Sequence, residues 1–208
     1  HPSFFACNFE MSAGVVSNCT IKSGMSTYTG NLAMMAGAPK LIDCILDNGA
    51  MNDTGSLACR GGGVKMSGSA EMINCVVTNC CAALGAGVYM ETSAKLYGCT
   101  VVGNRVRSDA SNAGLYVSGS AVVSNCVVRD NVTSDAKPAP ARGVYQTGGT
   151  IINTLITGHA SSNGGGVYKT NGSLVNCTVA GNTATTAGAG VYQSNGSIVN
   201  TAVGSLTS

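Results

Sequence analysis

Short runs in which apolar and polar residues alternate follow one another along the whole chain, and Gly or Asn-Gly pairs separate them. Alternation with a period of two is typical of β-strands, and such pairs mark turns. No segment shows the 3.6-residue periodicity of an amphipathic helix. The pattern therefore predicts an all-β protein that is built from short strands.

The pattern is also an internal repeat. Residues 164–179 return, with conservative changes, as residues 188–203, an offset of 24 residues. Spacing of this kind is typical of solenoids, in which each copy forms one supersecondary unit. We expect a single domain over residues 1–208 with eight copies, centred on a Cys column formed by Cys19, Cys44, Cys75, Cys99, Cys126, Thr154, Cys177 and Thr201.

Two aliphatic columns flank the Cys column. Three residues before it stand Val16, Leu41, Met72, Leu96, Val123, Ile151, Leu174 and Ile198. Two residues after it stand Ile21, Leu46, Val77, Val101, Val128, Ile156, Val179 and Val203. Because successive strand residues point to opposite faces, these columns and the Cys column should share one core. The prediction is an all-β, single-stranded parallel β-helix, or β-solenoid, of about eight coils with three short strands each.

A bend is expected immediately before each member of the Cys column. Asn and Gly tolerate the left-handed backbone that a tight bend requires. This bend column consists of Asn18, Asp43, Asn74, Gly98, Asn125, Asn153, Asn176 and Asn200.

Two motifs carry a resemblance to a known family. The strings at 61–64 and 164–167, both Gly-Gly-Gly-Val, are similar to the glycine-glycine-small-aliphatic motif of right-handed parallel β-helix repeats, and the string at 5–8 to their Phe-x-x-Asn motif. The chain thus resembles the pectate-lyase-like superfamily, especially secreted bacterial repeat proteins and chlamydial polymorphic outer-membrane proteins. The resemblance implies a right-handed coil, an extracellular or cell-surface location and often adhesion, but no particular substrate.

The charge pattern argues against several functions. Only 10% of the residues are charged and the net charge of +2 includes no basic run, so nucleic acid is not an expected partner. No stretch approaches the ~20 apolar residues that span a bilayer, so membrane insertion is not expected. The nine carboxylates are scattered and none follows Asp135, whereas β-helix enzymes use clustered carboxylates. We therefore expect no enzymatic activity, and a polysaccharide lyase or hydrolase ranks third among the candidate functions.

The cysteines could serve as metal ligands, as free thiols or as disulfides. Cys80 and Cys81 are adjacent, and no Cys/His cluster occurs in the second half of the chain, so neither a metal nor a cofactor is expected. In the Cys column, free buried thiols are favoured over bridges because stacked side chains point parallel to one another. The better candidate for a disulfide joins Cys59 to Cys80 or Cys81, in equivalent turns of neighbouring copies.

The outward columns suggest binding surfaces. A tyrosine row on the upstream strand could face a protein partner or a glycan, or could simply stack for stability; it comprises Tyr89, Tyr116, Tyr145, Tyr168 and Tyr192. An apolar outer column next to the bend could be covered by a partner or could reflect strand preference alone; it comprises Ile42, Ile73, Tyr97, Ile152, Val175 and Val199.

These features favour a non-enzymatic extracellular structural protein. Solenoids with open terminal coils present strand edges that template association, so either the chain is a segment of a longer solenoid or its ends stack on identical neighbours. We expect the chain to bind copies of itself, head-to-tail or laterally, in a fibre or surface assembly. The alternative is a carbohydrate-binding or adhesin module that uses the tyrosine row.

Overall fold

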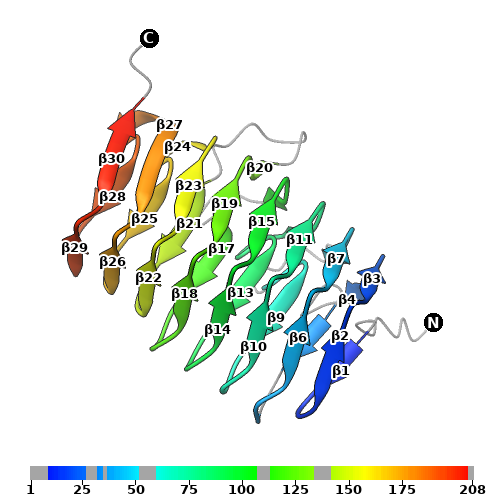
Figure 1. Cartoon of the computed structure of the whole chain (residues 1–208). Helices are drawn as coiled ribbons and strands as arrows, with labels where there is room; N and C mark the ends of the chain where they lie inside the picture. The colour runs from blue at the N-terminus through cyan, green and yellow to red at the C-terminus, as the bar shows by residue number, and fades with distance from the viewer. Residues whose placement is uncertain are drawn as a thin grey trace.

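The computed structural model describes residues 9–26, 32–34, 37–51, 60–106, 113–133 and 142–205. Within these ranges the secondary structure is entirely β, without helices, and the strands stack into a parallel β-solenoid. Figure 1 shows the copies following one another along a rod, from β1 at one end to β30 at the other. The predicted fold class is confirmed.

Four parallel sheets run along the rod. The first contains β1 (Phe9–Met11), β5 (Leu32–Met34), β9 (Val64–Met66), β13 (Val88–Met90), β17 (Ala113–Val117), β21 (Arg142–Gln146), β25 (Val167–Lys169) and β28 (Val191–Gln193). The second contains β2 (Val15–Ser17), β6 (Lys40–Ile42), β10 (Glu71–Ile73), β14 (Lys95–Tyr97), β18 (Val122–Ser124), β22 (Thr150–Ile152), β26 (Ser173–Val175) and β29 (Ser197–Val199).

The other two sheets follow the bend. The third contains β3 (Thr20–Lys22), β7 (Ile45–Asp47), β11 (Val76–Thr78), β15 (Thr100–Val102), β19 (Val127–Arg129), β23 (Leu155–Thr157), β24 (Ala160–Asn163), β27 (Thr178–Ala187) and β30 (Ala202–Ser205). The fourth is short, and contains β4 (Met25–Ser26), β8 (Ala50–Met51), β12 (Cys81–Ala82), β16 (Arg105–Val106) and β20 (Val132–Thr133).

Two details differ from the sequence prediction. The solenoid has about six turns, slightly fewer than the eight expected, and copies one to five carry a fourth strand of two residues. The last copy has a described neighbour on one side only, so its apolar columns are covered on that side alone. Ile198 and Val203 in the last copy are accordingly 38% and 51% exposed.

The core is formed by the predicted columns. From copy two to copy seven, both aliphatic columns are fully buried, and Leu174 and Val179 are both 0% exposed. Equivalent residues pair in register between copies, as Leu96 does with Met72 on one side and Val123 on the other. Each copy therefore buries its apolar face against its neighbours.

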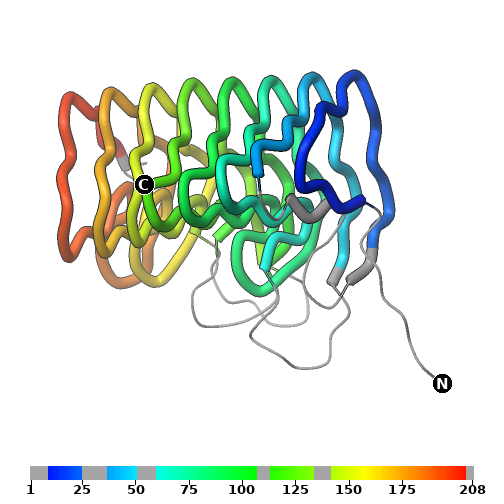
Figure 2. Tube along the Cα trace, turned by 90° about the horizontal axis from the view of Figure 1, so that it is seen from below, coloured from blue at the N-terminus to red at the C-terminus, as the bar shows by residue number. Residues whose placement is uncertain are grey.

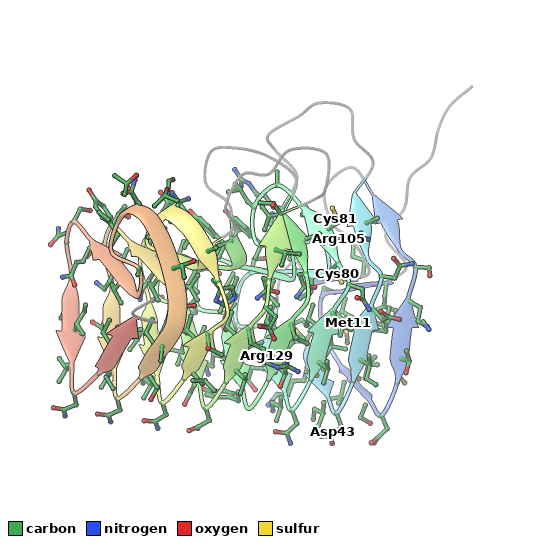
Figure 3. All side chains as sticks on the ribbon, turned by 90° about the horizontal axis from the view of Figure 1, so that it is seen from above. Met11, Asp43, Cys80, Cys81, Arg105 and Arg129 are labelled. Atoms are coloured by element: carbon green, nitrogen blue, oxygen red, sulfur yellow. The ribbon has the colours of Figure 1, made fainter. Side chains whose placement is uncertain are left out.

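The bend column also has the expected conformation. All eight members have positive φ, from 46° at Asn200 to 61° at Gly98, and each lies between a strand of the second sheet and one of the third. Left-handed backbone is least costly for Gly and Asn. Figure 3 shows Asp43 at the edge of the rod opposite Cys81 and Arg105.

The Cys column does more than fill space. The Cys44 amide N–H donates to Cys75 Sγ at 3.4 Å, and the Cys126 amide N–H donates to Thr154 Oγ1 at 3.4 Å. Each side chain also donates to the carbonyl two residues earlier, as Thr154 does to Ile152 at 2.9 Å. The column therefore requires a small side chain that accepts and donates, which explains why Thr replaces Cys. The preference for free thiols is confirmed for Cys44, Cys75, Cys99, Cys126 and Cys177.

Candidate interaction surfaces

The five tyrosines of the predicted row lie side by side on the outer face of the first sheet. Tyr89 and Tyr116 are stacked, with ring centroids 4.6 Å apart and planes at 1°, and Tyr168 and Tyr192 are stacked at 4.9 Å and 13°. Tyr145 links the two pairs through tilted contacts at 5.5 and 5.3 Å. The row is therefore continuous over five copies.

The row leaves few ring faces open to a ligand. In the two stacked pairs, one face of each ring is covered by its neighbour. The guanidinium of Arg60 lies 5.2 Å from the Tyr89 ring centroid, and that of Arg142 lies 4.4 Å from the Tyr168 centroid. Tyr89 is only 5% exposed, and burial raises its pKa to about 12. A partner would meet mainly ring edges, hydroxyl groups and arginines.

The apolar outer column lies in register on the second sheet. Its members are half-buried except Val199, which is 44% exposed. Three of these strands begin with a charged residue, and Glu71 accepts from Lys40 at 2.9 Å and from Lys95 at 3.1 Å. Over copies two to four, this face is therefore less uniformly apolar than the sequence column suggests.

Asp47, Glu71, Glu91 and Asp130 are engaged in ion pairs. Lys22 lies 3.3 Å from Asp47, which also accepts from Asn79 at 2.9 Å, and these contacts lower the pKa of Asp47. Contacts with two lysines likewise lower the pKa of Glu71. In the described part of the chain, no three His, Cys, Asp or Glu side chains come together in a way that could hold a metal ion.

A buried polar ladder runs through the interior and was not recognised as a unit in the sequence. It consists of Cys80, Asn104, Asn131, His159 and Asn182, all at most 2% exposed. Each side chain accepts from the copy before it: Asn104 Oδ1 from the Cys80 amide N–H, and Asn131 Oδ1 from the Asn104 amide N–H, both at 3.0 Å. The sequence contains one signal for this ladder: His159 occupies the same position in its copy as Asn104, Asn131 and Asn182 do in theirs.

A second polar column is buried near the C-terminal end of the rod. Gln146 and Lys169 are both 0% exposed and point inward, where earlier copies place Met66, Met90 and Val117. Lys169 Nζ donates to the carbonyls of Gly172 and Asn195, and burial lowers the pKa of its amine. No carboxylate among the described residues pairs with this cation.

The candidate disulfide falls partly outside the described residues. Cys59 is not among them, so its bridge to Cys80 or Cys81 stays a prediction. The Cys80 thiol lies in the interior, where it accepts from the Gly49 amide N–H at 3.4 Å, and burial raises its pKa to about 12. Cys81 is half-buried and lies beside Arg105 in the fourth sheet.

Comparison with known proteins identified no relative of this chain. No family model, no curated protein and no solved structure matches this chain. No helix in the described ranges has the length and hydrophobicity to cross a membrane.

Proposed function

We propose that this protein is a non-enzymatic extracellular structural protein, a β-solenoid that self-associates through its end coils and outer faces into a fibre or surface assembly. One observation carries the proposal: the core columns reach water in the last copy of the described solenoid. Leu174 and Val179 are fully buried, whereas Ile198 and Val203, one copy further on, are 38% and 51% exposed.

Strand edges at both ends support the same proposal. β1 and β28 are the outermost strands of the first sheet, and β2 and β29 are those of the second. Each pairs with one strand only within the described chain, which leaves a row of backbone donors and acceptors on its outer side. Pairing with another coil would satisfy these groups and cover the exposed core residues.

The extracellular location is supported by the resemblance of the glycine motifs to exported β-helix repeats, and the buried thiols are compatible with it. Burial raises the pKa of the Cys44 and Cys177 thiols. A protonated, inaccessible thiol is a poor nucleophile and resists oxidation. These two thiols can therefore persist unoxidised in an oxidising compartment.

Self-association can be tested by sedimentation velocity and electron microscopy over a range of concentrations. We expect concentration-dependent assembly that is lost in Ile198→Asp and Val203→Asp. Val132→Asp serves as the control, because Val132 is 48% exposed but lies in the fourth sheet, away from both end coils. Dispersed single rods of the unmodified protein at high concentration would contradict the proposal.

The alternative function, carbohydrate binding or adhesion through the tyrosine row, is favoured by the two arginines over it. Arg142 is half-buried, donates from Nε to the Asn163 carbonyl at 2.9 Å and pairs with no described carboxylate. Guanidinium groups beside aromatic hydroxyls suit an acidic glycan. Binding on a glycan array that is lost in Tyr116→Ala and Tyr145→Ala would support this function, and no binding to acidic or neutral glycans would remove it.

A further inference from the structure

The corner between the first and second sheets occurs in different lengths along the chain. We count the corner length from the first-sheet residue in register with Phe9 to the Cys-column residue of the same copy. This length is ten in copies one, six, seven and eight, for example from Phe9 to Cys19 and from Val191 to Thr201. Copies three to five have eleven, and copy two has twelve. The two end copies therefore share one corner length, although they lie at opposite ends of the rod (Figure 2).

The two main corner types have different conformations. Each eleven-residue corner contains one fully buried alanine, which is Ala70 in copy three, Ala94 in copy four and Ala121 in copy five. Three of the four ten-residue corners instead have a glycine of large positive φ, which is 90° at Gly14, 89° at Gly172 and 88° at Gly196, whereas Gly149 in copy six has 68°. The first copy thus has the same turn geometry as the last two.

Successive ten-residue corners fit closely together. A Cβ on Gly172 would lie 2.6 Å from the Gly149 carbonyl O of the preceding copy, and a Cβ on Gly196 would lie within 2.2 Å of the Gly172 carbonyl O. A Cβ on Gly14 would meet nothing within 4 Å. Among the described residues, nothing covers this side of Gly14, which is the side that faces the preceding copy at Gly172 and Gly196.

Glutamine side chains of the first sheet donate hydrogen bonds to these corners. Gln146 Nε2 donates to the Gly149 carbonyl of its own corner at 3.2 Å and to the Ser173 carbonyl of the next copy at 3.0 Å. Gln193 Nε2 donates to the Gly196 carbonyl of its own corner at 2.7 Å. It has a second N–H, for which the described chain offers no following copy.

We infer that the coil at 191–204 of one molecule stacks head-to-tail on the coil at 9–22 of a second copy, in the register that links consecutive copies within the chain. The inference rests on the proposed self-association and specifies its geometry. In this register Val191 covers Phe9, Ile198 covers Val16, and Val203 covers Ile21.

Polar groups match in the same register. Within the chain, the Cys177 amide N–H donates to Thr201 Oγ1 of the following copy at 3.2 Å. Across the new interface, the Thr201 amide N–H would donate in the same way to Cys19 Sγ, which is exposed in the single molecule. The free N–H of Gln193 would donate to the corner carbonyls around Gly14.

The geometry is tested by cross-linking an outward position on each end coil. Ser17 and Val199 are exposed and occupy equivalent positions, which head-to-tail stacking would bring about one strand spacing apart, ~4.8 Å. The variant Ser17→Cys/Val199→Cys, in a Cys19→Ser background, is treated with a short bismaleimide and digested for mass spectrometry. We expect links between residues 17 and 199 of different molecules and a series of multimers, both lost in either single variant.

A matched control places the first cysteine at Ser124, which occupies the same outward column in the middle of the rod. Ser124→Cys/Val199→Cys should give no 124–199 link. Links of 17 to 17 and 199 to 199, or assembly without any link between the end coils, would overturn head-to-tail stacking while leaving self-association intact. Absence of assembly at every concentration would overturn self-association itself.

Discussion

Mild acid should destabilise this protein through one buried imidazole. His159 is 2% exposed and lies between two asparagines of the polar ladder. Its Nδ1–H donates to Asn182 Oδ1 at 3.1 Å, and its Nε2 accepts from Asn131 Nδ2 at 3.2 Å, so the neutral ring is fully satisfied. Burial lowers the pKa of His159 from 6.5 to about 4, and the Asn182 hydrogen bond and the Asp130 charge offset this only in part.

The size of the effect follows from this pKa difference. Below pH 6.5 the unfolded chain binds a proton at this residue, whereas the folded imidazole stays neutral down to about pH 4. The free energy of unfolding therefore falls as the pH falls through this window. At about 1.4 kcal/mol per pH unit, the loss is about 2 kcal/mol by pH 5 and about 3 kcal/mol by pH 4.

Urea denaturation at pH 7.5, 6 and 5 measures this loss, with His159→Asn as the matched variant. Asn occupies the equivalent position in neighbouring copies and does not titrate, so the variant should have a nearly constant free energy of unfolding over this range. Asp47 and Glu71 have lowered pKa values and contribute only at more acidic pH. A wild-type protein equally stable at pH 7.5 and 5, or a variant that loses as much stability as the wild type, would refute the reasoning.

Three further substitutions test the interior. Cys126→Val should be less stable to urea than Cys126→Thr by about 1–3 kcal/mol, because valine leaves the buried Cys99 amide without its acceptor; equal stability would contradict the role assigned to the Cys column. Lys169→Gln should raise the free energy of unfolding at pH 7 by about 1–2 kcal/mol, since glutamine occupies this column in adjacent copies and removes a buried unpaired charge; a clear loss of stability would show that the cation is compensated. Gly63→Ala should lower the thermal midpoint, at a cost of about 1–3 kcal/mol, because its Cβ would lie 2.4 Å from a buried valine methyl. Gly204→Ala is the control, with its nearest contact at 3.9 Å, and should leave the midpoint unchanged.

Polar interior positions were the hardest to predict. Lys169 and Gln146 follow outward tyrosines in the strand alternation, so their inward direction could be deduced, but a buried lysine is rare without a partner. Their partners are turn carbonyls of the same copy and the next, brought close by coil stacking. The fourth sheet was missed for a different reason: two-residue strands such as Arg105–Val106 are too short to show alternation.

The repeat, the inward columns and the bends follow from the amino-acid sequence alone, because in a solenoid every copy obeys the same local rules and each column is sampled eight times. The number of turns that enclose a core and the ring faces that the tyrosines cover are set by the tertiary structure. Those properties depend on the neighbour that each residue meets across copies. A single copy, read alone, does not specify that neighbour.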